Sequence, residues 1–236
     1  MNKRMDKQLV SVIMPVKNGE RFLRESISSI LKQDYSLVEV IIVDGQSTDA
    51  TEQIAKSFKK VRYIYQDENP GIPQAKNLGI KIAKGEFIAF ASHDDIWAPQ
   101  KLSTQIDYMN CHQVLYTITM VKYFLEPGSP LKTGFNEKLL NGNYIGKMPE
   151  TLVARKSLFD SIGSFSTEFN YMEDIDWFNR AELNNISMAV IDDVLLFKRV
   201  HDTNVSYDSS KISRINKEIM YLLKESVDRN RVLSKK

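Results

Sequence analysis

Short apolar runs alternate with helix-like stretches over the first hundred residues of the chain. The runs at 9–14, 38–43, 61–65 and 86–91 are short and rich in β-branched residues, which predicts four buried strands. Apolar residues at helical spacing fill the intervals between them. Strands that alternate with helices need crossover connections, and these place helices on both faces of a mainly parallel sheet. The sequence therefore predicts an α/β fold of this kind.

The intervening helices carry recognisable ends. The first begins near Glu20, and the second is expected to be capped by Ser47, with Asp49 in a first turn that favours negative charge. The third spans about 72–84, and Gly85 ends it. The pattern thus places a helix after each of the first three strands.

The second half of the chain is less regular. We expect strands at 114–124, 151–154 and 188–200, and helices at 101–109, 157–162 and 174–183. Apolar residues at helical spacing also predict an amphipathic C-terminal helix, formed by Ile212, Ile215, Ile219, Leu222, Leu223 and Val227. We interpret residues 1–210 as one domain and 211–236 as a helical appendage. The appendage is expected to pack on the domain, with contact to a membrane surface or an oligomer partner as the alternative.

Composition narrows the class of protein. A formal net charge of +2 over 236 residues gives no reason to expect a nucleic-acid partner. Cys111 is the single cysteine, so we expect a reducing, cytoplasmic setting and a buried, inert thiol. No apolar stretch approaches the roughly 18 residues of a transmembrane segment, and the N-terminus lacks the apolar block of a signal peptide.

Polar clusters follow three of the predicted strands, at 15–19, 44–49 and 92–95. Ligands of open parallel sheets bind at the carboxyl ends of the strands, so these clusters predict a binding site at one edge. Neither a Gly-x-Gly-x-x-Gly pattern after the first strand nor a phosphate-binding Gly-x4-Gly-Lys-Ser/Thr loop is present. This argues against dinucleotide dehydrogenases and P-loop enzymes.

Four ordered motifs resemble family 2 glycosyltransferases of the GT-A fold. They are Val-Ser-Val-Ile-Met-Pro-Val-Lys-Asn-Gly at 10–19, Val-Asp-Gly-Gln-Ser-Thr-Asp-Ala-Thr at 43–51, residues 68–79, and 84–90 ahead of two aspartates. The resemblance resumes at 172–177 and 199–201. It implies transfer of a sugar from a nucleotide-sugar donor, with a divalent metal and inversion at the anomeric carbon. It also implies a nucleotide-binding half at about 8–110 and an acceptor half at about 111–210.

The resemblance assigns donor contacts to Pro15, Val16, Asn18, Asp44 and Lys76. A carboxylate at Asp44 matches the N3–H edge of uracil, which favours UDP as the donor nucleotide. The alternative is that Asp44 only begins a turn and caps the next helix. Lys76 is expected to meet the diphosphate, or else to be an ordinary solvated helix lysine.

The same resemblance implies a metal site. Asp94 and Asp95 are expected to hold Mn²⁺ or Mg²⁺ against the diphosphate, although Ser92 stands where many relatives carry an additional Asp. The alternative is that these aspartates cap the following helix. His201 is expected near the metal, with the plainer role of a core or surface histidine as the alternative. Arg199 is expected to pair with phosphate oxygens.

Glu173 and Asp174 resemble the acceptor-site motif of the family. Inverting transfer requires a general base, which the resemblance places at Asp174, with Glu173 orienting the acceptor. The alternative is acidic capping of the helix at 174–183, which Asp176 would serve equally well. Trp177 and Phe178 are expected in the core rather than under a sugar.

The sequence thus predicts an inverting glycosyltransferase that uses a UDP-sugar. The acceptor, whether a carbohydrate, a lipid-linked sugar or a peptide, is not defined, and the stretch at about 114–149 is expected to help choose it. Two alternatives remain: a catalytically weakened nucleotide-binding scaffold of a glycan-assembly complex, and a metal-dependent nucleotidyltransferase.

Overall fold

The computed structural model describes residues 8–68, 71–131, 135–169, 171–204 and 216–220. Its centre is a sheet with strand order β3-β2-β1-β4-β8-β6-β9-β5, and β7 pairs with β6 outside this path. The strands are β1 (Val10–Val16), β2 (Val38–Asp44), β3 (Val61–Tyr65), β4 (Phe87–Phe90), β5 (Ile96–Trp97), β6 (Tyr116–Leu125), β7 (Asn143–Ile145), β8 (Val153–Arg155) and β9 (Ala189–Val200).

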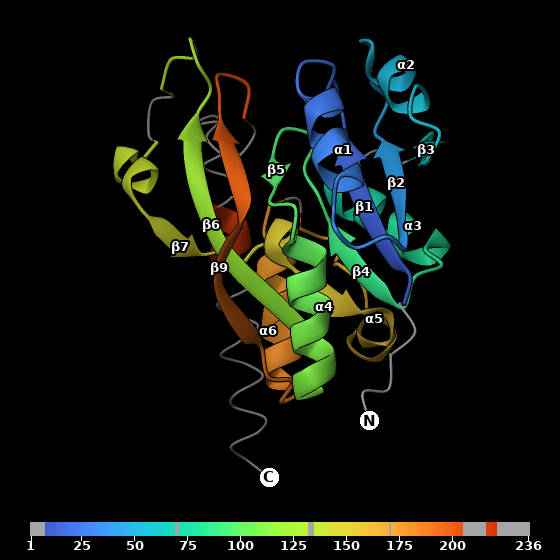
Figure 1. Cartoon of the computed structure of the whole chain (residues 1–236), viewed down its shortest axis with the longest axis vertical. Helices are drawn as coiled ribbons and strands as arrows, with labels where there is room; N and C mark the ends of the chain where they lie inside the picture. The colour runs from blue at the N-terminus through green and yellow to red at the C-terminus, as the bar shows by residue number, and fades with distance from the viewer. Residues whose placement is uncertain (1–7, 69–70, 132–134, 170, 205–215, 221–236) are drawn as a thin grey trace.

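The N-terminal half of the sheet is parallel throughout. β1 pairs in parallel with both β2 and β4, and β2 pairs in parallel with β3. β8 is antiparallel to β4 and β6, and β6 then runs parallel to β9. Figure 1 shows β6 and β9 as two long neighbouring strands beside the β1–β4 group. The ends of β1, β2, β4 and β9 therefore point the same way.

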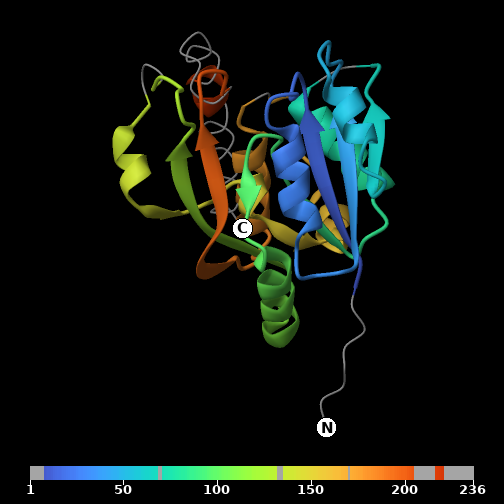
Figure 2. The ribbon, with the colours of Figure 1, turned by 45° about the horizontal axis from the view of Figure 1, so that its top comes forward.

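Helices connect the strands and cover the sheet. They are α1 (Leu23–Leu31), α2 (Thr51–Lys56), α3 (Ile72–Ile82), α4 (Lys101–His112), α5 (Lys156–Ile162) and α6 (Glu173–Leu183), with 3-10 turns η1 (Glu137–Asn141) and η2 (Pro149–Thr151). Figure 2 shows α1 and α2 on the near side of the parallel strands. None of the described helices has the length and apolarity needed to cross a bilayer.

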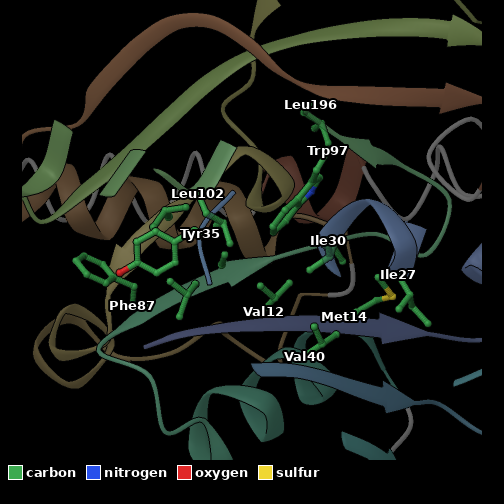
Figure 3. Packing of buried hydrophobic residues seen from close by; sticks show 14 of the residues in the cluster. Val12, Met14, Ile27, Ile30, Tyr35, Val40, Phe87, Trp97, Leu102 and Leu196 are labelled. Atoms are coloured by element: carbon green, nitrogen blue, oxygen red, sulfur yellow. The ribbon is translucent and has the colours of Figure 1, made fainter. Parts of the chain in front are cut away.

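Alternating residues of β1 build two separate cores. Val12 and Met14 pack in a cluster with Ile27 and Ile30 of α1, as Figure 3 shows. Ile13 faces the other way, into the cluster to which α3, α5 and α6 contribute. Because successive strand residues point to opposite faces, a fully apolar strand must be covered on both sides. The prediction of helices on both faces of the sheet is confirmed.

Gly79 allows α3 to lie close against the sheet. A Cβ atom built at this position would lie 2.3 Å from Cγ2 of Ile13 on β1. Any larger residue would push the helix away from the strand. Since the start of α3 carries Lys76, this close packing also fixes one wall of the site described below.

Three local expectations were wrong. Ser47 does not cap α2, because the helix begins four residues later and its side chain hydrogen-bonds to Asp44 instead. Cys111 is exposed on α4 rather than buried. The short strands β5 and β7 have no counterpart among the predicted elements. Two or three residues are too few to show a period in the sequence.

The predicted C-terminal helix lies mostly outside the described residues. Residues 216–220 are helical, and of the predicted apolar stripe only Ile219 falls among them, with 38% of its surface exposed. The neighbouring Glu218 is buried, and its carboxylate accepts a hydrogen bond from the backbone N–H of Tyr171 at 2.9 Å. The observed contact of this segment is therefore polar.

Candidate active site

A cavity of about 580 Å³ lies at the carboxyl ends of the parallel strands. Its walls come from the ends of β1, β2, β4 and β9 and from the starts of α3 and α6. The polar and charged side chains on it include Lys17, Lys76, Ser92, His93, Asp94, Glu150, Glu173, Asp174, Lys198 and Asn204. The fold thus brings residues almost two hundred positions apart to one surface, at the edge where the sequence predicted a site.

Asp44 ends β2 beside the cavity and is not itself part of its wall. It is 1% exposed, and one carboxylate oxygen accepts from the backbone N–H and hydroxyl of Ser47, at 2.8 and 2.7 Å. The other accepts from the hydroxyl of Tyr63 at 2.8 Å. A carboxylate has about four acceptor positions, so one remains for a ligand. The turn-forming role and a ligand-binding role are therefore compatible.

Asn18 lies next to the cavity rather than on its wall. Its side-chain oxygen accepts from the backbone N–H of Thr48 at 2.9 Å, and its own N–H donates to Ser47 at 2.8 Å. These bonds join the loop after β1 to the loop after β2. Of the expected contacts on β1, Pro15 and Val16 line the cavity, whereas Asn18 holds the two loops together.

Asp94 and His201 form a buried pair across the site. Nε2 of His201 lies 3.0 Å from Oδ2 of Asp94, and the histidine is 3% exposed. Ser92 donates to the other carboxylate oxygen, and Asn204 donates to Oδ2 at 3.2 Å. Burial opposes ionisation, but His201, His93 and the other neighbours together hold the pKa of Asp94 well below its usual range. The carboxylate therefore stays ionised.

Asp95 and Arg199 are held by contacts within the protein. The Asp95 carboxylate faces inward and accepts from Nζ of Lys198 at 3.1 Å and from the Arg199 backbone N–H at 3.0 Å. The Arg199 guanidinium bonds to Glu25 at 2.6 Å, to Glu126, and to the Asp94 carbonyl at 2.9 Å. Neither side chain lines the cavity. In this structure Asp95 and Arg199 hold the ends of β4 and β9 together, and their roles as metal ligand and phosphate contact stay predictions.

The Asp94–His201 pair fits a divalent cation. No group of three or more His, Cys, Asp or Glu residues arranged for a metal occurs among the described residues. Two protein ligands nevertheless suit an ion that takes its remaining ligands from substrate phosphates and water, as Mg²⁺ commonly does. Carboxylate and imidazole together are compatible with Mn²⁺ or Mg²⁺.

Lys76 and Glu173 form an ion pair on the opposite wall. Their charged atoms are 2.8 Å apart, and each side chain is 7% exposed. Burial lowers the pKa of Lys76, but the carboxylates of Glu173, Glu150 and Asp174 together outweigh it and raise that pKa above the usual value. Lys76 is therefore not a solvated helix lysine. It is a charged group held at the cavity wall.

Asp174 is the carboxylate suited to exchange a proton. It lines the cavity at the first turn of α6, and its side chain accepts from the N–H of Ile175 at 2.8 Å. Burial raises the pKa of Asp174 to about 6, against the opposing effect of the Lys76 ammonium. A carboxylate with a raised pKa, exposed to a cavity, has the properties of a general base near neutral pH.

Glu173, Asp174 and Asp176 all lie in the first turn of α6, so a helix-start role for these acids stays an alternative. Met172 is the N-cap of α6 and makes no side-chain cap bond. Asp176 pairs with Nε of Arg180 at 2.8 Å, so it serves the helix and not the cavity. Trp177 and Phe178 are 0% and 1% exposed, as expected of core residues.

Sequence reasoning missed three residues that complete the site: Tyr63, Lys198 and Asn204. Tyr63 is bonded to Asp44, and the other two line the cavity. Strand alternation could have found Lys198, because it and Arg199 are consecutive and must point to opposite sides of β9. No sequence signal distinguishes Tyr63 from other strand aromatics.

Sequence comparisons identify the family of the chain. A family model described as Glycosyl transferase family 2 matches residues 11–166. An uncharacterized glycosyltransferase of Rickettsia typhi is 32% identical over 248 residues, covering 92% of this chain and 76% of the relative. The Escherichia coli UDP-Glc:alpha-D-GlcNAc-diphosphoundecaprenol beta-1,3-glucosyltransferase WfgD is 34% identical over 195 residues, covering 78% of this chain and 74% of WfgD.

The fold has a solved counterpart. The crystal structure of S. aureus TarS 1-349 in complex with UDP-GlcNAc superposes with a TM-score of 0.67 at 25% identity, and covers 83% of this chain. The match spans 60% of that TarS chain. Together with a cavity at the carboxyl ends of a mainly parallel sheet, these matches show that the chain belongs to glycosyl transferase family 2 and has the GT-A fold.

Proposed function

We propose that this glycosyltransferase moves a sugar from a UDP-sugar to an acceptor hydroxyl, with inversion at the anomeric carbon. The observation that carries the proposal is a single cavity that joins the ends of β1, β2 and β4 to Asp174. UDP-glucose in the name of WfgD, and UDP-GlcNAc bound to TarS, support the choice of nucleotide.

Residues 8–110 hold the nucleotide in this proposal. Pro15, Val16 and Gly45 supply the wall beside the base and ribose. Asp44 accepts the N3–H of uracil with the acceptor position that Ser47 and Tyr63 leave open. Cytosine has no hydrogen at this nitrogen, so a UDP donor fits this carboxylate better.

Asp94 and His201 would hold the Mn²⁺ or Mg²⁺ ion. When bound, such an ion neutralises the negative charge that develops on the departing diphosphate. The hydrogen bonds from Ser92 and Asn204 orient the Asp94 carboxylate at the cavity wall. His201 lies behind it, hydrogen-bonded to Asp94 and 3% exposed.

Asp174 removes the proton of the attacking hydroxyl. Inversion requires the acceptor to approach opposite to the leaving diphosphate, so the base must face the sugar from another wall than Asp94. The Lys76–Glu173 pair lies beside the base and is already satisfied, so of the two adjacent acids at the start of α6 Asp174 is the one able to accept a proton. Glu173 also holds Lys76 where it can face the donor phosphates.

The acceptor half, 111–210, contributes Tyr123 and the segment Lys147 to Glu150 to the same cavity. This supports a role for the 114–149 region in acceptor choice. Carbohydrate, lipid-linked and peptide acceptors all present the hydroxyl that the reaction needs.

Incubation with a panel of UDP-, GDP- and CDP-sugars and Mn²⁺ tests the proposal. We expect release of UDP from one or more UDP-sugars, detected by chromatography, and no pyrophosphate. Pyrophosphate release would instead indicate a nucleotidyltransferase. UDP binding without turnover on any donor or acceptor would favour a scaffold role.

A further inference from the structure

Lys198 occupies a position in the cavity that the family motifs do not explain. It lies near the end of β9 and lines the wall beside Asp94. Its side chain is 17% exposed, and the residue is part of the cavity wall. Its charge therefore acts inside the site and is weakly screened by solvent.

The structure fixes the Lys198 ammonium and keeps it charged. Oδ2 of Asp95 lies 3.1 Å from Nζ, and the Asp95 side chain is 1% exposed. Burial lowers the pKa of Lys198, but the carboxylates of Asp95, Glu150 and Asp94 outweigh burial and raise that pKa well above its usual value. An ammonium has three N–H groups, and Asp95 accepts from one of them. The others can reach a ligand.

The charges at this wall favour binding of an anion more than a wall with a cluster of carboxylates would. Ser92 replaces a potential negative charge with a hydroxyl that is hydrogen-bonded to Asp94. Asp95 is paired with Lys198 inside the protein, and Asp94 is paired with His201. A diphosphate at this wall would meet the carboxylates of Asp94 and Glu150 and the fixed cation of Lys198.

The other cations near the cavity are less suited to this role. Lys17 is exposed, the Lys147 side chain is 45% exposed, and Lys76 is paired with Glu173 on the opposite wall. The Arg199 guanidinium is occupied by Glu25, Glu126 and a carbonyl. Among the described residues lining the cavity, Lys198 is thus the buried cation beside Asp94.

We propose that Lys198 binds the diphosphate of the donor. Its ammonium group supplies positive charge that a metal ion, held by a larger set of carboxylates, would otherwise supply. The inference rests on the proposed UDP-sugar donor and extends it. It implies that the chain binds UDP through its phosphates even when divalent metal is removed.

Calorimetric titration of the full chain in EDTA, with UDP and with uridine, tests the inference. The unmodified protein should bind UDP more tightly than uridine. Lys198→Met should weaken UDP binding about 10- to 100-fold, as expected for loss of a hydrogen bond to a charged group, and change uridine binding less than about twofold. Lys198→Arg should keep most of the affinity for UDP.

Two further variants serve as controls for this experiment. Lys122→Met removes the same charge from an exposed residue of the neighbouring strand β6, and should leave UDP binding unchanged. Asp95→Asn/Lys198→Met avoids leaving an unpaired buried carboxylate, and should lose UDP affinity while retaining a normal melting temperature.

The outcomes separate the two proposals. Equal UDP affinities for the unmodified protein and Lys198→Met in EDTA would overturn the inference, as would UDP binding in EDTA that is no tighter than uridine binding. Failure to bind UDP even with Mn²⁺ present would overturn the proposed donor itself, and the role of Lys198 with it.

Discussion

The ammonium of Lys76 on α3 lies 2.8 Å from the carboxylate of Glu173 on α6, and each side chain is 7% exposed. The same ammonium lies 4.9 Å from the ring centroid of Phe165. The pair therefore joins α3 to α6 in a largely dry setting. Removing one partner of such a pair leaves an uncompensated buried charge.

Glu173→Gln should therefore lower the free energy of unfolding by about 3–5 kcal/mol. Lys76→Met/Glu173→Gln should recover most of this stability, because no buried charge remains. Denaturant melts of the two single variants and the double variant measure the coupling. As a matched control, Glu52→Gln breaks an exposed pair with Lys56 and should cost about 0.5 kcal/mol or less. Similar losses for Glu173→Gln and Glu52→Gln would contradict this description of the site.

Asp44→Ala should reduce the preference for UDP over GDP and CDP. The substitution removes the acceptor proposed for the uracil N3–H, a contact worth about 1.5–3 kcal/mol. Calorimetry with the three diphosphates measures the preference. Tyr63→Phe removes one hydrogen bond to Asp44 but keeps the carboxylate, so it should retain the preference. Equal affinities of the unmodified protein for all three diphosphates would show that Asp44 serves only the turn.

Turnover should decline as the pH falls through about 6. Burial raises the pKa of Asp174 to about 6, and the protonated carboxyl cannot accept the acceptor proton. Lys76→Met removes a cation that lowers this pKa, so the acid limb of the kcat profile should move to higher pH. A limb that stays in place in Lys76→Met, or moves to lower pH, would argue that another group controls the reaction.

Because of Lys101, the free energy of unfolding should increase with pH in the alkaline range. Its side chain is fully buried at the start of α4, where Nζ donates to Gln105 at 2.6 Å, and burial lowers the pKa of Lys101 from 10.5 to about 7. Between these values the unfolded chain binds a proton that the folded chain does not, so the free energy of unfolding increases with pH.

Lys101→Met should flatten that dependence. Urea melts at pH values near 7 and near 10 should differ by a few kcal/mol in the unmodified protein and by much less in the variant. Lys122→Met, at an exposed position, should keep the slope of the unmodified protein. A slope that persists in Lys101→Met would assign the pH dependence to other groups.

The parallel half of the fold was predictable because its strands are buried on both faces. Residues 10–16 and 38–44 are almost wholly apolar, and helical periods separate them, so pattern and packing agree. The edge where the site lies followed from topology alone. β5 and β7 were not predictable, since two or three residues in pairing with a long strand leave no period of their own.

Residue types alone could not predict which role each side chain has in the site. Asp94 and Asp95 are consecutive aspartates, yet one faces the cavity and the other an internal lysine and backbone N–H. Arg199 matched a motif but is held by Glu25, which lies 174 positions away in the chain. Such partners are set by tertiary packing, so a motif identifies the cluster but not which member meets the ligand.

The assignment of Asp174 as the base is tested most directly by measuring kcat and the UDP dissociation constant on the same preparation of Asp174→Asn. General-base catalysis supplies about 10²- to 10⁴-fold, so kcat should fall by that factor while UDP affinity changes less than about twofold. Asp176→Asn, which disrupts only the pair with Arg180, should keep kcat within about tenfold. Near-normal turnover in Asp174→Asn, with Glu173→Gln or Asp176→Asn inactive, would contradict the account.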